Sequence, residues 1–236
     1  MTDEEYLKKY LKTNELAQGL KRLKKGQPVQ YIIGNVNFYG NTIDVTKDTL
    51  IPRFETELLV SKTIDYIKSY FKKKVSIIDL GTGSGNIAIT LAQKIPSEVT
   101  AVDISPKALN IARKNAKKNG VKIKFYQNDM LNNITEKFDV IISNPPYISY
   151  DEKVEDIVKN NEPSIALYAK NNGLEFYEKI LSKAKNKINE KALIAFEIRK
   201  DQGANVKNIA LKYFPNSKII IEKDYPGKDR FVFIFI

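Results

Sequence analysis

Short apolar runs alternate with segments of helical periodicity over most of the chain after Val75. The apolar runs span residues 75–80, 98–104, 122–127, 138–143, 191–198, 217–222 and 230–236. Between them, residues 86–94, 106–120, 173–188 and 203–213 have the spacing of helices that bury one face. Alternating strands and helices are typical of a mostly parallel sheet with helices on its faces, so the pattern predicts an α/β fold with a seven-stranded sheet.

The last two apolar runs are joined differently from the others. Only residues 223–229 separate 217–222 from 230–236. Parallel neighbours need a long crossover, whereas antiparallel neighbours can be joined by a short loop. We therefore expect a C-terminal antiparallel hairpin on an otherwise parallel sheet.

The first residues of the chain follow helical spacing. Thr2 and Glu5 form a candidate capping box, which predicts a short helix directly after Thr2. Asn14 can cap a second short helix, and Gly26 can end it. We expect residues 1–25 to form a short N-terminal helical segment.

A second small unit follows these helices. Residues alternate in polarity on both sides of Gly40-Asn41, which predicts a β-hairpin. Pro52 ends the extended segment after the hairpin, and helical spacing runs from near Glu55 to about residue 71. We therefore expect residues 26–53 to form a β-hairpin linker and residues 54–236 to form the main domain.

Composition limits the chemistry that is available. The chain has 236 residues with no cysteine and no histidine, so it offers no thiolate, no histidine base and few ligands for a metal. Hydrolase triads and zinc sites are therefore poor candidates, and we expect no metal. No apolar run reaches the ~20 residues of a membrane span, and the N-terminus is not a secretory signal, so we expect no membrane partner and a cytoplasmic protein.

The net charge of +11 suggests attraction to RNA, to ribosomes or to an acidic protein. However, the lysines are spread along the chain and there are only five arginines, whereas phosphate-reading surfaces concentrate both residue types. We therefore interpret the charge as a general consequence of the lysine-rich composition, and we expect no stable nucleic-acid partner.

A glycine-rich loop follows the first strand of the main domain. "DLGTGSG" alternates glycine with polar residues, and Asp103 ends the next strand, where an acid can accept hydrogen bonds from a ribose. The dinucleotide fingerprint G-x-G-x-x-G is not met, and Asp79 disfavours a pyrophosphate. A cationic nucleoside such as S-adenosylmethionine, with S-adenosylhomocysteine as product, fits better than a dinucleotide. The expected cofactor-binding residues in these two segments are Gly81, Thr82, Gly83, Ser84, Gly85 and Asp103.

Two further residues extend this candidate cofactor site. Asp129 and Met130 follow the third strand of the domain. The carboxylate of Asp129 can accept a hydrogen bond from an adenine amino group, and the soft Met130 side chain can cover the ring. An ordinary surface loop remains an alternative reading of this pair.

The segment "NPPY" ends the fourth strand. Two prolines remove two backbone donors and restrict two φ angles, and Asn144 before them is pushed towards an extended conformation. The side-chain oxygen of Asn144 and the carbonyl of Pro145 can accept the two N–H bonds of a carboxamide or an amine. Tyr147 can pack on such a flat group, so the corner predicts a methyl-accepting site.

In this order and spacing, "DLGTGSG", "AVDIS", "ND" and "NPPY" resemble class I S-adenosylmethionine-dependent methyltransferases with a Rossmann-like fold. "GQPVQYIIGNVNFYG", "LIPRFETELLV", "NEPSIALYAKNNGLEFYEKI" and "DYPGKDRFV" resemble the protein-(glutamine-N5) methyltransferases that modify peptide chain release factors. The likeness runs from about Arg22 to Ile236. The segment before Gly26 is shorter than the N-terminal helical domain that is usual in that family, and Arg199 stands where the family commonly has glycine.

The resemblance implies an enzyme that methylates N5 of the glutamine in the Gly-Gly-Gln loop of release factors. It implies catalytic roles for Asn144, Pro145 and Tyr147, with Asn144 also next to the cofactor. The implied substrate-binding residues are Leu50, Asn144, Pro145, Pro146 and Tyr147. Leu50 to Glu57 would lie over the substrate mouth, with Arg53 and Glu55 orienting loops, and we expect a monomer.

Other classes of function remain open at this stage. A nucleic-acid methyltransferase acting on an adenine or guanine amine would use the same corner, because a conjugated exocyclic amine resembles an amide. A binding module that retains the nucleoside fold without catalysis is a third reading. A hydride-transferring dehydrogenase is disfavoured by the glycine spacing.

Overall fold

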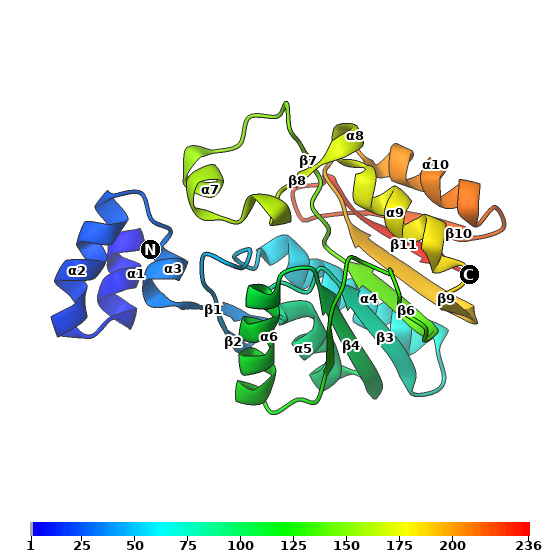
Figure 1. The fold of residues 1–236 in the computed structure, drawn as a ribbon, viewed down its shortest axis with the longest axis horizontal. Coiled ribbons are helices and arrows are strands. Elements are labelled where there is room, and N and C mark those ends of the chain that lie inside the picture. The colour runs from blue at the N-terminus through cyan, green and yellow to red at the C-terminus, as the bar shows by residue number, and fades with distance from the viewer. Residues whose placement is uncertain (1) are drawn as a thin grey trace.

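A seven-stranded sheet forms the centre of the computed structural model, which describes residues 2–236 (Figure 1). The strands lie in the order β10-β11-β9-β6-β3-β4-β5. Their bounds are β3 Val75–Leu80, β4 Ser97–Asp103, β5 Lys124–Gln127, β6 Phe138–Ser143, β9 Ile188–Glu197, β10 Lys218–Lys223 and β11 Asp229–Phe235. All pairs are parallel except those made by β11, so the predicted α/β fold and the C-terminal antiparallel hairpin are both confirmed.

Helices cover both faces of this sheet. The first face carries α4 (Phe54–Tyr70), α5 (Asn86–Lys94) and α6 (Pro106–Lys118), and the second carries α9 (Glu175–Ala184) and α10 (Gly203–Tyr213). Successive strand residues point to opposite faces, so Ile77 joins the core beneath α4 and α5, and Ile78 joins the core beneath α9. Because both faces are buried, the central strands are nearly continuous apolar runs, as the sequence indicated.

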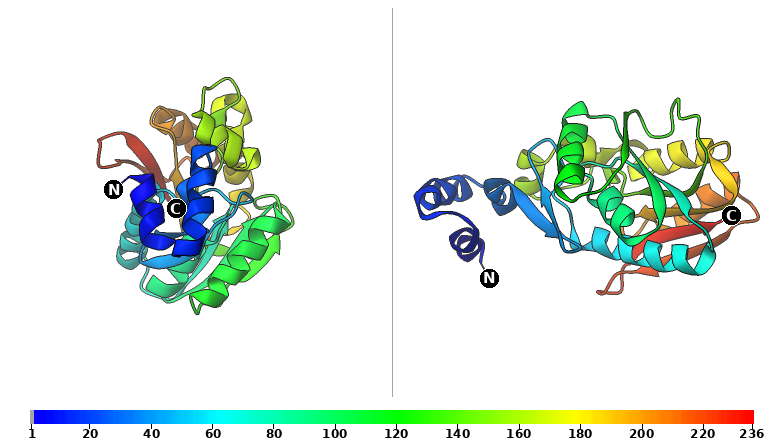
Figure 2. Two further views of the ribbon diagram at one scale, coloured as in Figure 1. Left: turned by 90° about the vertical axis from the view of Figure 1, so that its left-hand side faces the viewer. Right: turned by 90° about the horizontal axis from the view of Figure 1, so that it is seen from below.

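Three short helices stand at one end of the molecule, away from the C-terminus (Figures 1 and 2). They are α1 (Asp3–Tyr10), α2 (Thr13–Lys24) and α3 (Val29–Ile33), and they share a small core around Leu7. The capping box of Thr2 and Glu5 is confirmed, with hydrogen bonds in both directions. Asn14 does not cap α2, because the helix begins one residue earlier and Lys12 takes the N-cap position.

The predicted hairpin is present, but its turn is shifted by one residue. Strand β1 (Asn35–Phe38) pairs with β2 (Asn41–Asp44), and Phe38 lies opposite Asn41. The two turn residues are therefore Tyr39 and Gly40, both with positive φ, as a tight two-residue turn requires. Asn41 belongs to the strand because its side chain is buried beside Thr90.

Residues 144–173, for which the sequence pattern predicted no helix or strand, form a structured flap. This segment contains β7 (Ile148–Ser149), α7 (Asp156–Asn161), the 3-10 turn η1 (Ser164–Ala166), β8 (Tyr168–Ala169) and α8 (Lys170–Gly173). Strands β7 and β8 make a separate parallel pair above the carboxyl ends of the main strands. Elements this short leave no hydrophobic periodicity, which explains why the pattern missed them. In the part of the chain described, no helix has the length and apolar character needed to cross a membrane.

Candidate active site

The candidate site lies at the point of the sheet where the order of successive strands reverses. From β3 the chain continues through β4 to β5 on one side, whereas β6 and β9 lie on the other side. The loops that follow the carboxyl ends of β3 and β6 therefore run to opposite sides and leave a crevice between them. Ligands bind in this crevice in sheets of this kind. A cavity of about 210 Å³ occupies this position.

Two glycines of the loop after β3 form part of the cavity wall. Gly81 and Gly83 both have positive φ, and a Cβ added to either would enter open space. Thr82 and Ser84, the polar residues that alternate with the glycines of this loop, do not line the cavity. The Thr82 hydroxyl donates to Asp79, and Ser84 bonds to Asn86, so both side chains point into the protein. The glycines therefore present their backbone to the cavity, whereas the side chains of Thr82 and Ser84 point inwards and stabilise the turn.

Gly85 has a role in packing that the sequence did not predict. It is the N-cap of α5 with positive φ, and it does not line the cavity. A Cβ at this position would lie 3.1 Å from Cβ of Ala112 and 3.3 Å from its Cα. Gly85 therefore permits the close packing of α5 on α6, and its contact with a cofactor stays a prediction.

Asp103 lies at the end of β4 on the cavity wall, as expected. Its Oδ2 accepts from the backbone N–H of Gly83 (2.8 Å) and its Oδ1 from that of Ser105 (2.9 Å). Burial raises the pKa of this carboxyl group, although the backbone donors oppose the shift. These bonds hold the carboxylate against the glycine loop, and each oxygen keeps a lone pair for a ribose hydroxyl.

The cavity also has apolar walls and one ion pair. Met130 and Phe176 line it, and Ile104 lines it beside Asp103. Asp129 lies there too, but its carboxylate also accepts from Lys179 Nζ at 2.5 Å. Any hydrogen bond from an adenine amino group would share this carboxylate with Lys179.

Asp79 has the one buried side-chain oxygen without a hydrogen-bond partner among residues 2–236. The Thr82 hydroxyl binds its other oxygen at 2.6 Å. Burial raises its pKa to about 7, and the nearby Asp103 carboxylate adds to the shift. Asp79 does not line the cavity, whereas Asp103 does. Two neighbouring acidic residues at this edge disfavour a phosphate, so the site fits a cationic ligand such as S-adenosylmethionine better.

A second cavity of about 220 Å³ adjoins the first. Pro145 and Tyr147 line it, together with Arg53 and residues of the flap. Asn144 and Leu50 line both cavities. The NPPY corner therefore lies between a space that suits a nucleoside and a space that opens towards the flap.

Pro146 lies on the first cavity and not on the second, where we expected it. In an extended segment, successive side chains point to opposite sides. Pro145 and Tyr147 therefore line the second cavity, Pro146 lines the first, and Asn144 at the start of the corner lines both. Burial also raises the pKa of Tyr147 above its ordinary value, so its ring is neutral over the physiological range.

A hydrogen-bonded chain lies behind Asn144. Its side-chain Nδ2 donates to Thr56 Oγ1 at 3.0 Å. The Thr56 hydroxyl donates to Glu197 Oε2 at 2.7 Å. Thr56 and Glu197 are both buried. Thr56 belongs to the segment 50–57 that we expected over the substrate mouth, but the sequence did not predict the hydrogen bonds that join it to Asn144 and Glu197.

Arg53 and Arg230 each form an ion pair that joins separate parts of the structure or orders a turn. Arg53 forms an ion pair with the buried Glu162 at 2.5 Å, and Glu162 also accepts from the backbone N–H of Ile51. This pair ties the segment before α4 to the flap. Arg230 donates to Asp224 and orders the turn of the last hairpin.

Several cavity residues were missed by sequence reasoning. Asp48 and Thr49 reach the first cavity from the loop after β2, Ile165 and Ala166 from the flap, and Glu175, Phe176 and Lys179 from α9. The hairpin is held beside the glycine loop by the buried Asn115, which bonds to backbone atoms of both Asp44 and Ser84. No local pattern marks these residues, because each reaches the site only through the packing of separate elements.

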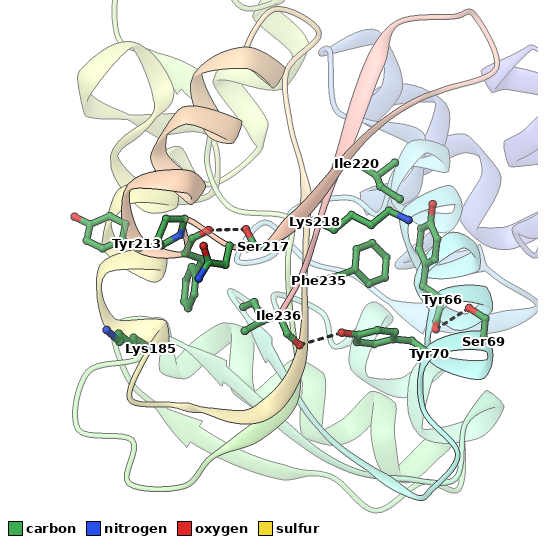
Figure 3. Close-up of a pocket in the computed structure, with 13 residues that line it drawn as sticks. Tyr66, Ser69, Tyr70, Lys185, Tyr213, Ser217, Lys218, Ile220, Phe235 and Ile236 are labelled. Carbon is green, nitrogen blue, oxygen red and sulfur yellow. Dashed lines mark hydrogen bonds between the residues drawn. The ribbon is translucent and has the colours of Figure 1, made fainter.

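The largest cavity lies elsewhere, at the amino ends of the parallel strands (Figure 3). It measures about 790 Å³ and is lined by residues of α4, the loop before β10 and the end of β11. Its hydroxyl groups bond to neighbouring residues: Tyr70 donates to the carbonyl of Ile236, and Tyr66 donates to Glu222. No unpartnered buried polar atom within residues 2–236 points into it, so it does not have the character of a reaction site.

Known proteins resemble this chain in sequence and in fold. A family model described as "Methyltransferase small domain" matches residues 42–162. The "Release factor glutamine methyltransferase" of Bacillus subtilis (strain 168) is 44% identical over 215 residues, which cover 88% of this chain and 75% of the relative. The protein of the same description from Lactococcus lactis subsp. lactis (strain IL1403) is 41% identical over 220 residues, which cover 92% of this chain and 80% of the relative.

A solved structure agrees with these relatives. The protein-(glutamine-N5) methyltransferase (release factor-specific) of Alicyclobacillus acidocaldarius is 25% identical, with a TM-score of 0.50 over 81% of this chain and 98% of that chain. Similarity in sequence extends over most of the chain, and the folds match. The chain therefore belongs to the release factor glutamine methyltransferase family, whose fold is that of the class I S-adenosylmethionine-dependent methyltransferases.

Proposed function

We propose that this protein transfers a methyl group from S-adenosylmethionine to the side-chain N5 of the glutamine in the Gly-Gly-Gln loop of peptide chain release factors. The observation that carries the proposal is the position of Asn144 in the walls of both cavities. One polar side chain can thus contact a bound nucleoside and a flat group that enters from the flap side. Membership of the family identifies that group as a glutamine amide.

The first cavity suits S-adenosylmethionine in its charge and shape. Asp103 can accept from the ribose, the open backbone at Gly81 and Gly83 allows close approach, and Met130 with Phe176 offers apolar faces for a base. When bound, this cofactor supplies an electrophilic methyl group on a positively charged sulfur. The Asp103 carboxyl group on the cavity wall, when ionised, would favour a positively charged ligand there.

The second cavity would hold the glutamine side chain. Asn144 Oδ1 and the carbonyl of Pro145 can accept the two N–H bonds of the carboxamide, and proline has no N–H that competes. Tyr147 lines the same cavity and can pack on the amide plane. Two fixed acceptors hold the nitrogen with its lone pair directed towards the first cavity, so catalysis consists mainly of positioning and charge complementarity.

No general base is required before transfer. The amide nitrogen would use its lone pair to take the methyl group, and the sulfur–methyl bond would break with its electron pair left on sulfur. The nitrogen would then be cationic and would lose one proton to water. This order agrees with a chain that contains no histidine. The half-buried Tyr147 has a pKa raised above its ordinary value, so the phenol is neutral and would serve as a packing surface and not as a base.

The release factor would approach across the flap and the start of α4. Phe54 and Tyr225 stack at 5.9 Å and are exposed to 58% and 79%, beside Arg53 on the second cavity. Exposed aromatic pairs at the rim of a cavity are suited to protein contacts. We propose that the enzyme acts as a monomer in the cytoplasm, with the release factor as its protein partner.

The test is transfer from labelled S-adenosylmethionine to a purified release factor that carries either glutamine or alanine in its Gly-Gly-Gln loop. We expect label on the glutamine protein and none on the alanine protein. Transfer to tRNA or DNA with none to either protein would refute the proposal and support the nucleic-acid alternative. Binding of the cofactor without transfer to any of these acceptors would support a non-catalytic module.

A further inference from the structure

The rotation of the Asn144 side chain determines whether the site offers an acceptor or a donor. An asparagine amide carries an oxygen on one side and an NH₂ group on the other, and the two have almost the same shape. The amide of the substrate presents N–H donors, so only Asn144 Oδ1 can bind it productively. A half-turn of this side chain would place donor against donor.

The surroundings of Asn144 distinguish the two rotations. Its Nδ2 donates to Thr56 Oγ1, and no hydrogen bond engages its Oδ1 in the described chain from residue 2 onward. Thr56 is 3% exposed and lies in the first turn of α4, packed against the ends of β6 and β9. Water therefore has little access to the hydroxyl, and protein groups determine its direction.

A hydroxyl group has a single proton, and Thr56 directs it to the carboxylate of Glu197 at 2.7 Å. With that proton engaged, Thr56 Oγ1 can only accept from Asn144. An ionised Glu197 cannot donate, so the chain has one direction: Asn144 donates to Thr56, and Thr56 donates to Glu197. Glu197 lies at the end of β9, one residue beyond the Ser143–Phe196 pair, and thus next to Asn144 in the sheet.

We propose that Thr56 and Glu197 are positioning residues that hold the Asn144 amide with its oxygen towards the methyl acceptor. This inference rests on the proposed function, because it assigns a role in presenting an acceptor to the substrate nitrogen. Neither residue touches the reacting atoms. Both act through the direction of two hydrogen bonds.

The protonation state of Glu197 determines whether the two hydrogen bonds can run only from Asn144 to Thr56 to Glu197. A protonated Glu197 could donate to Thr56, which would then donate to Asn144 and favour the opposite rotation. Burial raises the pKa of Glu197 to about 7. The groups that face it are Arg53 and Glu55 near the start of α4, Tyr147 of the corner, Tyr177 of α9 and Arg230 of β11. The two arginines favour the ionised form, and Glu55 disfavours it.

The chain offers a matched set of variants on one helix. Thr56→Val removes the hydroxyl and preserves the shape, whereas Thr56→Ser keeps the hydroxyl. Thr63→Val is the control, because Thr63 is also buried on α4 but donates only to the carbonyl of Leu59 within the helix. A merely structural role of the hydroxyl would give Thr56→Val and Thr63→Val the same properties.

We expect Thr56→Val to lower kcat at least 10-fold relative to Thr63→Val, with cofactor Kd within about 3-fold, because Asn144 Oδ1 is then no longer fixed towards the transition state. Thr56→Ser should retain kcat within about 3-fold of the wild type. Measured at saturating cofactor, wild-type kcat should rise with pH through about 7, and Glu197→Gln should give a lower kcat without that rise. Equal kcat values for Thr56→Val and Thr63→Val would overturn the proposal.

A second measurement does not depend on any acceptor. Side-chain amide proton exchange of Asn144, followed by NMR, should be slower in the wild type and Thr63→Val than in Thr56→Val. If the wild type transfers no methyl group to a release factor, the proposed function fails, but this comparison still tests the hydrogen-bonded chain. Identical exchange in all three proteins would overturn the chain whatever the substrate.

Discussion

Two cavities of this protein lie at opposite edges of the same sheet, one at the amino ends and one at the carboxyl ends of its parallel strands, and they differ in character. The space at the amino ends is larger, about 790 Å³, but its hydroxyl groups already bond to neighbouring residues (Figure 3). The space at the carboxyl ends is about 210 Å³, and it adjoins a second one of about 220 Å³. There, Asp103 and Asn144 present acceptors that the protein does not use fully.

The comparison shows that volume alone does not make a reaction site. Parallel strands deliver four loops to one edge, and each loop adds a polar group or a bare backbone to the same crevice. At the other edge, the packing of helices leaves space but no convergent polar groups. Substitutions should therefore have large effects in the small cavities and small effects in the large one.

The largest expected effect is that of Asn144→Ala. Removing one of two fixed acceptors should lower kcat by about 100-fold or more, on the scale of other preorganised hydrogen-bonding groups. Cofactor Kd, measured by calorimetry, should change less than about 3-fold. An equal loss of turnover and of cofactor affinity would assign Asn144 to the nucleoside and not to the acceptor.

The next effect concerns cofactor affinity. Asp103→Ala should raise the Kd for S-adenosylmethionine about 10- to 100-fold, because hydrogen bonds to a charged group contribute roughly 1.5–3 kcal/mol. The loss should be larger than for Asp129→Ala, since Asp129 is partly engaged by Lys179. A larger loss in Asp129→Ala would show that the base and not the ribose dominates binding.

A smaller effect is expected in the pH dependence of stability. Asp79 has a folded-state pKa of about 7, above the ~3.9 of an unfolded aspartate. Its contribution to stability is therefore complete below about pH 4 and is lost as pH rises through 7. We expect Asp79→Asn to gain free energy of unfolding relative to the wild type between pH 4 and 8, measured by urea denaturation. A constant difference across this range would mean that Asp79 is ionised throughout in the folded protein.

The smallest effect on activity is expected in the larger cavity. Tyr70→Phe removes the hydroxyl that donates to the carbonyl of Ile236, and should cost about 1 kcal/mol of unfolding free energy. Its kcat and cofactor Kd should stay within about 2-fold of the wild type. A drop in turnover comparable to that of Asn144→Ala would contradict the distinction between the two cavities.

Much of the main domain could be predicted from local pattern. The strand 138–143 and the helix 86–94 were placed without error at both ends, because a buried apolar run and a regular helical spacing are local signals. The hairpin turn was displaced by one residue, since the pairing of Phe38 with Asn41 depends on which side chains are buried. Prediction failed most clearly in the flap, whose short elements are held by contacts with distant residues.

The sequence by itself determined the order of strands and helices, the chemistry available without histidine or cysteine, and the polar residues at strand ends. Those properties depend on residue type and on spacing within one segment. Only the tertiary structure decided that Gly81 and Gly83 face the cavity while Gly85 serves packing, and that Thr56 and Glu197 lie behind Asn144. Such choices depend on contacts between segments as far apart as 141 residues, which no local pattern encodes.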